Sequence, residues 1–286
     1  MNGWLIYPEA EAIRNEAFIN WVIEEGEKLN LSIQLFLREN FQLGIIDSNL
    51  TITYKGKKID LPNFAIVRVM DPFFSKQLEL LDIPVFNSSF VSEVCNHKAK
   101  THQIIAQLSV PTVDTIFLQR FSGERSSIPF PFPVILKEAE GRGGKQVVLI
   151  SDENDFIQNV DAFVGRDVVV QRPAGTTGKD LRVFVIGDEI IAAVLRSSET
   201  DFKANFTLGG SAHLYTLSDS EKQIIYTIID EFEFDFVGID FLFDEEGNLL
   251  FNEIEDVVGS RTLSATSDIN IVELYLHHII RKLKKD

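Results

Sequence analysis

Three carboxylates in the C-terminal third of the chain stand at a spacing that could hold a metal ion. Residues 236–255 contain two apolar strands around a turn-forming segment, which predicts a β-hairpin. A two-residue turn at Glu246-Gly247 places Asp240 directly opposite Glu253, and strand alternation puts Glu255 on the same face as Glu253. Opposed Cβ atoms in such a pair lie about 4.5–5.5 Å apart, so we expect the three carboxylates to converge.

These three acids repel one another on one strand face, and one of them would have to take up a proton if nothing offset their charge. A divalent cation removes this cost, since carboxylate oxygens and substrate phosphates are the usual ligands of magnesium. The prediction depends on register, because a slip of one residue turns Asp240 to the other face. Solvated acids on an exposed strand are the alternative interpretation of the same pattern.

A second group of residues suits a phosphate-binding site. Within residues 132–150 an apolar strand ends near Lys137, and Gly141, Gly143 and Gly144 precede another apolar strand. Glycines let backbone N–H groups approach an anion, and lysine supplies a point charge for phosphate. The spacing of a Walker loop is absent, and a glycine-rich turn without a ligand is the alternative. Because Lys137 stands inside an apolar strand, we expect it to be partly buried and to need an anionic partner.

Two arginines are expected on neighbouring strands of the last third. Arg182 interrupts one apolar strand, and Arg196 ends the next. A cation within an apolar strand suggests a bound anion or carboxylate. A salt bridge from Arg182 to Asp180 or to Glu189 explains the pattern equally well, so this segment alone leaves both interpretations open.

The elements that must position these residues are read from hydrophobic periodicity. In the first 95 residues strands and helices alternate, which predicts a small α/β unit with a mainly parallel sheet. A helix and a β-rich segment follow, and the last third opens with three apolar strands. The expected strands span residues 4–7, 31–37, 64–69, 85–86, 167–171, 181–186 and 189–196, with the β-rich segment at 115–150 and the hairpin at 236–255. The expected helices span residues 10–29, 76–81, 91–108, 220–232 and 270–284.

The composition is that of an ordinary globular chain, with 286 residues, 45% of them hydrophobic and 24% charged. No uncharged apolar run reaches about 18 residues, which predicts no membrane span, and Pro8 and Glu9 come too early for a signal peptide. The net charge of −16 repels phosphate backbones, so no nucleic-acid partner is expected. Cys95 is the only cysteine, so no intrachain disulfide forms and a cytoplasmic location is expected.

Together these segments resemble the ATP-grasp superfamily, specifically its RimK-like carboxylate–amine ligases, over nearly the whole chain. No single motif is specific, but their order and spacing are. The matching segments are Asn87-Ser-Ser, His97-Lys98, Lys137 with the glycine turn at 141–144, Gly178-Lys-Asp180-Leu-Arg182, Asp201-Phe-Lys203-Ala-Asn205, and the hairpin from Gly238-Ile-Asp240 to Glu253-Ile-Glu255. The resemblance implies an α/β (α+β) chain. Its parts are a parallel-sheet pre-ATP-grasp domain at residues 1–95, an N-terminal grasp lobe with the glycine loop at 96–170, and a C-terminal grasp lobe with the metal site at 171–286.

The resemblance also implies an ADP-forming ligase that uses ATP and Mg²⁺, with Mn²⁺ as an alternative ion, to join a carboxylate to an amine through an acyl phosphate. The substrate would be an amino acid, a peptide or a protein, and a homo-oligomer is compatible with it. The implied ATP-binding residues are Lys98, Lys137, Gly141, Gly143, Gly144, Gln171, Arg172, Asp180, Lys203 and Asn205. The implied metal ligands are Asp240, Glu253 and Glu255, and the implied catalytic residues are Arg182 and Arg196.

Two positions depart from the family pattern. Gln171 replaces an acid that the family often has at the hinge, and Glu255 stands where relatives usually have asparagine. The extra charge of Glu255 should tighten metal binding or alter the preferred metal geometry. Residues 256–263 also lack the usual Ser-Pro-Gly continuation, in a region that normally faces the substrates of the family. The identity of the substrate is therefore not inferred from glutamate-adding relatives. Arg261 is a candidate contact for a substrate carboxylate. The alternative functions are a peptide-modifying ligase that makes amide or ester crosslinks and a catalytically inactive nucleotide-binding regulator.

Overall fold

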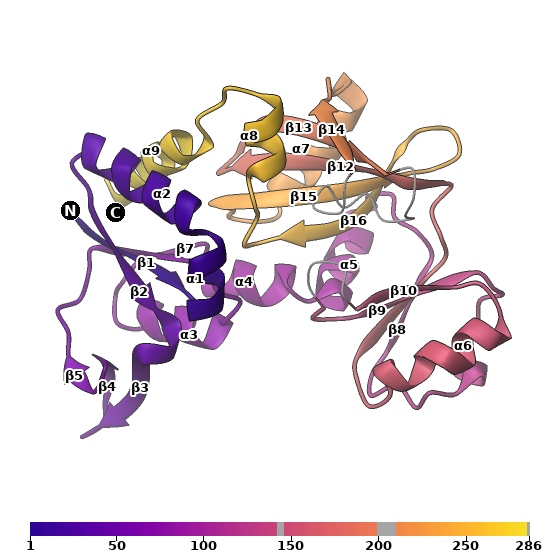
Figure 1. The fold of residues 1–286 in the computed structure, drawn as a ribbon, viewed down its shortest axis with the longest axis horizontal. Helices are drawn as coiled ribbons and strands as arrows, with labels where there is room; N and C mark the ends of the chain where they lie inside the picture. The colour runs from indigo at the N-terminus through magenta and orange to yellow at the C-terminus, as the bar shows by residue number, and fades with distance from the viewer. Residues whose placement is uncertain (142–145, 199–209, 285–286) are drawn as a thin grey trace.

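The computed structural model describes residues 1–141, 146–198 and 210–284. It is a mixed α/β structure built around four sheets (Figure 1). Within the described residues, no helix has the length and the apolar composition that crossing a bilayer requires.

The N-terminal sheet is parallel throughout, with the strand order β2-β1-β6-β7, as the alternating pattern predicts. Its central strand β6 is buried throughout, whereas the edge strand β2 keeps Ser32 and Gln34 exposed. The helix expected at residues 10–29 is two helices that meet at Asn15. The elements are β1 (Asn2–Tyr7), α1 (Glu9–Arg14), α2 (Glu16–Lys28), β2 (Ser32–Leu37), β6 (Phe64–Val67), α3 (Pro72–Glu79) and β7 (Val85–Phe86).

A small antiparallel sheet between β2 and β6 was not predicted. It consists of β3 (Phe41–Ile46), β4 (Asn49–Tyr54) and β5 (Lys57–Lys58). The β3–β4 turn at Asp47-Ser48 has positive φ at both residues, 50° and 63°, as a tight hairpin turn requires.

The described middle part of the chain forms three α-helices and an antiparallel sheet in the order β10-β9-β11-β8. The expected helix at 91–108 is interrupted at Asn96-His97, where the ring of His97 accepts a hydrogen bond from the Lys100 N–H and begins the second helix. Helix α6 was not predicted. The elements are α4 (Ser89–Cys95), α5 (Lys98–Gln107), β8 (Thr115–Leu118), β9 (Val134–Glu138), β10 (Val147–Ile150), α6 (Glu153–Asn159) and β11 (Val168–Gln171).

The C-terminal sheet is antiparallel, with the order β14-β13-β12-β15-β16. Strand β11 precedes this sheet in the chain but joins the middle sheet, between β9 and β8. The elements are β12 (Thr176–Ile186), β13 (Glu189–Ser197), β14 (Ser211–Leu214), α7 (Asp219–Ile229), β15 (Phe236–Phe243), β16 (Leu249–Glu255), α8 (Arg261–Thr266) and α9 (Ile271–Leu283). Short 3₁₀ helices span Arg38–Asn40, Arg125–Ser127 and Val160–Phe163.

The cores show which parts of the chain are packed together. One hydrophobic cluster joins Leu5 and Ile66 of the N-terminal sheet to Phe236 of β15 and Leu276 of α9. A second fills the space between the C-terminal sheet and helices α5 and α7, and the middle sheet has a separate cluster with α6. The parallel sheet and the C-terminal sheet therefore share a core, and the middle sheet has a core of its own at the opposite end of the molecule from the parallel sheet (Figure 1).

Candidate functional site

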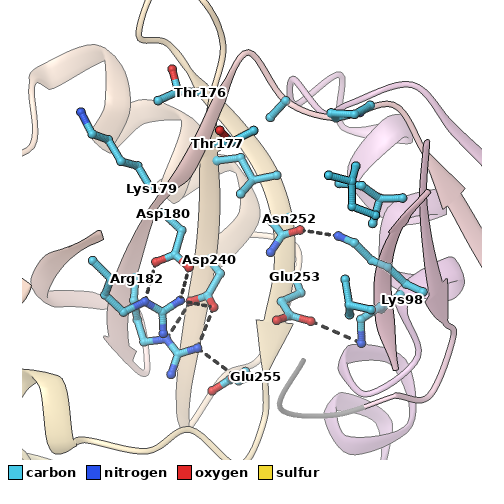
Figure 2. Close-up of a pocket in the computed structure, with 18 of the residues that line it drawn as sticks. Lys98, Thr176, Thr177, Lys179, Asp180, Arg182, Asp240, Asn252, Glu253 and Glu255 are labelled. Carbon is cyan, nitrogen blue, oxygen red and sulfur yellow. Dashed lines mark hydrogen bonds and ion pairs between the residues drawn. The ribbon is translucent and has the colours of Figure 1, made fainter. Parts of the chain in front are cut away.

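A cavity lies where the C-terminal sheet faces the middle sheet (Figure 2). It encloses about 990 Å³ of empty space, part of it open to solvent. Its charged lining gathers nine side chains from α5, β9, β12, β13, β15 and β16. Lys179 of β12 is one of them, and it is exposed. The other eight are Lys98, Lys137, Asp180, Arg182, Arg196, Asp240, Glu253 and Glu255.

The hairpin brings its three carboxylates together. Asp240 pairs directly with Glu253, as predicted, and Asp240, Glu253 and Glu255 each offer an oxygen within 4.8 Å of the others. The predicted two-residue turn is wrong, because the connection runs over residues 244–248. That longer connection would pair Asp240 with Asn252. A β-bulge beyond Asp240 adds one residue on β16 and restores the pairing with Glu253.

Arginines offset the charge of the most deeply buried carboxylate. Arg182 donates to both oxygens of Asp240, from Nε at 2.8 Å and from Nη2 at 2.6 Å, and Arg196 Nη2 donates to Oδ2 at 2.8 Å. Burial favours the neutral acid, but the two guanidinium charges outweigh it and lower the pKa of Asp240 to about 2. A divalent cation is therefore not the sole group that offsets the repulsion within the hairpin.

Each arginine has a second carboxylate partner. Arg182 Nη2 lies 2.7 Å from Glu255 Oε1, and Arg196 bonds both oxygens of Asp180, which faces it across β12 and β13. Burial raises the pKa of Asp180 to about 6 against the lowering effect of Arg196. Burial likewise raises the pKa of Glu255. Of the two open interpretations, Arg182 is in a salt bridge, but among the described residues its partners are Asp240 and Glu255.

The two lysines approach from the other side of the cavity. Lys98 Nζ lies 3.3 Å from Glu253 Oε2 and donates to the carbonyl of Gly141 at 2.5 Å. Lys137 is buried, as predicted, but it donates to the neutral amide oxygen of Asn252 at 2.8 Å. Burial therefore lowers the pKa of Lys137 to about 8, with the charge of Glu253 acting in the opposite direction.

Some lining residues were missed by sequence reasoning. Asn252 is the extra residue of the bulge, so strand alternation alone would not place it and Glu253 in the same cavity. Apolar side chains from three strands form another part of the wall, and their periodicity marks them only as strand residues. These apolar residues are Ile135, Val147, Leu149 and Leu242.

Several predicted residues lie elsewhere. The Gln171 side chain is buried against His102, with Nε2 2.7 Å from the ring, and also bonds Thr115. Arg172 is exposed and pairs with Asp114. Neither Gln171 nor Arg172 is among the described residues that line the cavity.

The remaining predicted residues divide into two groups. Arg261 is exposed at the start of α8 and donates to Asn15 Oδ1 at 3.2 Å, away from the cavity. Gly141 lines the cavity. Gly143, Gly144, Lys203 and Asn205 lie outside the described residues.

The donor set fits a hard divalent cation. Asp240, Glu253 and Glu255 supply only oxygen atoms, which Mg²⁺ prefers, and the cavity leaves room for phosphates beside them. Lys98, Lys137 and the two arginines present the positive charge that phosphates and carboxylates require.

Comparison with known proteins also indicates an ATP-grasp ligase. Residues 95–279 match the model of the RimK-like ATP-grasp domain. An alpha-aminoadipate–LysW ligase, LysX, of Saccharolobus solfataricus is 24% identical over 272 residues, covering 92% of this chain and 97% of the relative.

Two solved structures share the fold. The D-alanine–D-alanine ligase of Bacillus anthracis complexed with ATP superposes with a TM-score of 0.72 and 16% identity, covering 100% of this chain and 98% of the other. The ATP-grasp ligase PsnB complexed with a minimal precursor has a TM-score of 0.68 and 15% identity, covering 98% and 97%. The fold class and the resemblance inferred from the sequence are thereby confirmed. The chain belongs to the RimK-like ATP-grasp family of ATP-dependent ligases.

Proposed function

We propose that the chain is a magnesium-dependent carboxylate–amine ligase that activates a carboxylate with ATP and forms an amide bond. The observation that carries this proposal is the cavity in which four buried cationic side chains meet three mutually close carboxylates. Such a site suits phosphoryl transfer, where positioning and electrostatic stabilisation supply most of the catalysis.

Asp240, Glu253 and Glu255 would hold the divalent cation, which neutralises phosphate charge when it is bound. Lys98 and Lys137 would bind the phosphates from the facing lobe. The apolar wall formed by Ile135, Val147, Leu149 and Leu242 suits the flat adenine ring. We therefore assign contact with the adenine to this apolar wall and not to the side chains of Gln171 and Arg172, which contact His102 and Asp114.

The proposed reaction has two steps. An oxygen of the substrate carboxylate attacks the γ-phosphorus of ATP, the bond to the β-phosphate oxygen breaks, and ADP leaves. The amine nitrogen then attacks the acyl carbon, phosphate leaves with the bridging oxygen, and the amine loses a proton. Arg182 and Arg196 would orient the carboxylate and stabilise the charge that develops on it.

The class of substrate is a further part of the proposal. The relative LysX is named for aminoadipate and LysW, and PsnB was solved with a precursor. An amino acid, a peptide or a protein would each suit an opening to solvent of this kind. A peptide-modifying ligase that makes amide or ester crosslinks stays the second candidate, since PsnB has the same fold.

We also propose that residues 1–95, 96–170 and 171–286 act as a substrate-side domain and two grasp lobes. The separate hydrophobic cluster of the middle sheet supports its treatment as a lobe of its own.

The test measures ADP and phosphate release with Mg²⁺ and a panel of amino acids and peptides, with hydroxylamine added to trap an acyl phosphate. Substrate-dependent ADP release with a hydroxamate product supports the ligase. Mass spectrometry then identifies the joined product, and a loss of water from a peptide indicates a crosslink. If the protein binds ATP but turns it over neither with any member of the panel nor with a cell extract as the source of substrate, the inactive regulator would be favoured.

A further inference from the structure

The three predicted metal ligands are all engaged by cationic side chains in the described structure (Figure 2). Asp240 is bonded by Arg182 and Arg196, and Glu253 lies 3.3 Å from Lys98. Glu255 lies 2.7 Å from Arg182. The cations that should receive phosphate or carboxylate are therefore already held by the carboxylates that should receive the metal ion.

Arg182 is the residue that connects two of these carboxylates. Its guanidinium is buried and makes a two-point contact with Asp240, which alone satisfies Nε and one Nη2 hydrogen. The same Nη2 also bonds Glu255 on the outer strand β16. Arg182 Nη2 is thus shared between two of the proposed metal ligands, Asp240 and Glu255.

The backbone leaves room for this contact. Gly238 pairs with Glu255 across β15 and β16, and it has no side chain to separate Glu255 from Arg182. A Cβ at Gly238 would lie 3.5 Å from Arg182 Cδ and 2.6 Å from Val258. A side chain at Gly238 would therefore clash with Val258 and pack against Arg182 beside its contact with Glu255.

The charges of the described lining largely offset one another without a ligand. Four carboxylates, namely Asp180, Asp240, Glu253 and Glu255, face four buried cations, namely Lys98, Lys137, Arg182 and Arg196, and the exposed Lys179 adds a fifth positive charge to the lining. An anion that enters alone must compete with these carboxylates for the cations, in a region of low dielectric where unpaired charge is costly. An anion and a divalent cation that enter together preserve the balance.

We propose that Glu255 is a positioning residue that holds Arg182 on the metal-ligand carboxylates and so makes anion binding depend on a divalent cation. With Glu255 engaged by a bound cation, Arg182 Nη2 would be free to meet an anion in the cavity, whether a substrate carboxylate or the phosphates of ADP. The inference rests on the proposed function only in taking Asp240, Glu253 and Glu255 as metal ligands. It adds a control on the order in which charge enters the site.

The experiment measures ADP affinity by calorimetry in EDTA and again in excess Mg²⁺. Glu255→Gln keeps the shape of the side chain and removes its charge, so ADP should bind without metal roughly tenfold or more tightly than in the parent protein. Glu255→Asp keeps the charge and should keep metal-free binding weak. Circular dichroism verifies that each variant is folded, and Glu255→Asn is the second neutral variant.

Two comparisons separate positioning from a general loss of negative charge. Glu253→Gln removes an equal charge from the same hairpin and loosens Lys98 instead of Arg182. It should tighten metal-free ADP binding less than Glu255→Gln does, because the Lys98–Glu253 contact is longer, at 3.3 Å against 2.7 Å. In an Arg182→Met background the effect of Glu255→Gln should disappear, because the cation that it releases is gone. Equal effects of the two glutamine variants, or an unchanged effect in the Arg182→Met background, would overturn the inference.

The failure of the proposed function gives a different result. Manganese binding by the parent protein, followed by electron paramagnetic resonance, should weaken in Glu253→Gln. If the parent protein binds no manganese with or without ADP, the metal-ligand assignment and this inference fall together. If manganese binds normally and metal-free ADP affinity is the same in the parent protein and in Glu255→Gln, only the inference falls.

Discussion

Replacing Lys137 and varying the pH together test whether this lysine binds phosphate. Lys137 is buried on β9 and has a pKa of about 8 because burial disfavours its charged form. The groups that face it are Glu253 on β16, and Lys98 and His102 on α5. Burial lowers the pKa of His102 to about 3, so His102 stays neutral near pH 7 and above.

The magnitude follows from the pKa of Lys137. Since phosphate bonds the protonated amine, affinity is lost as pH rises through about 8. With that pKa, the protonated fraction falls from about 0.9 at pH ~7 to about 0.1 at pH ~9, so ADP should bind about tenfold more weakly at the higher pH. ADP itself contributes little, because phosphate has its second pKa near ~6 and is ionised across this range.

The assay is calorimetric titration of ADP in excess Mg²⁺ at several pH values between about 6.5 and 9.5. Lys137→Arg should retain binding and lose the pH step, since arginine stays protonated. Lys137→Met should bind ADP weakly at every pH and show a flat profile. A parent protein whose ADP affinity stays level through this range would refute the reasoning.

Three further predictions concern the site and its supports. Glu253→Ala should abolish substrate-dependent ADP release while the circular dichroism spectrum stays unchanged, and normal Mg²⁺-dependent turnover would contradict the metal assignment. Gly175→Ala should lower the free energy of unfolding by about 1–3 kcal/mol in urea, because its Cβ would meet the backbone N of Glu245. Asn87→Ala should lower it by at least about 2 kcal/mol, because the Asn87 side chain bonds both the backbone of Phe236 and the carboxylate of Asp256. If Asn87→Ala unfolds at the same urea concentration as the parent protein, these buried hydrogen bonds do not stabilise the fold.

The sequence by itself determined the local parts of the site. Alternation along 236–255 was sufficient to predict a hairpin that gathers Asp240, Glu253 and Glu255, because a hairpin joins strands that are close in sequence, although the direct pairing of Asp240 with Glu253 depends on the bulge. An apolar strand interrupted by a lysine was sufficient to predict that Lys137 is buried. The parallel N-terminal sheet followed from the alternation of strands and helices.

Only the tertiary structure decided what each charged group faces. The bulge that brings Asn252 into the cavity depends on how the strands close, and no residue type in the sequence marks it. Gln171 turns toward His102, 69 positions away in the chain, and Arg261 turns toward Asn15, 246 positions away. Partners at such separations are set by how sheets and helices pack on one another. Hydrophobic periodicity predicts which face of an element is buried, but it does not predict which element covers that face.

The arginines show this division most clearly. The sequence placed Arg182 and Arg196 on neighbouring strands and left an anion and a salt bridge as equal alternatives. Both arginines bond the predicted metal ligand Asp240, and Glu255 and Asp180 are their other carboxylate partners. These contacts arise because the strand order places β12 between β13 and β15. The sequence determined which charges the chain carries into the site, and the order of the strands decided which of them meet.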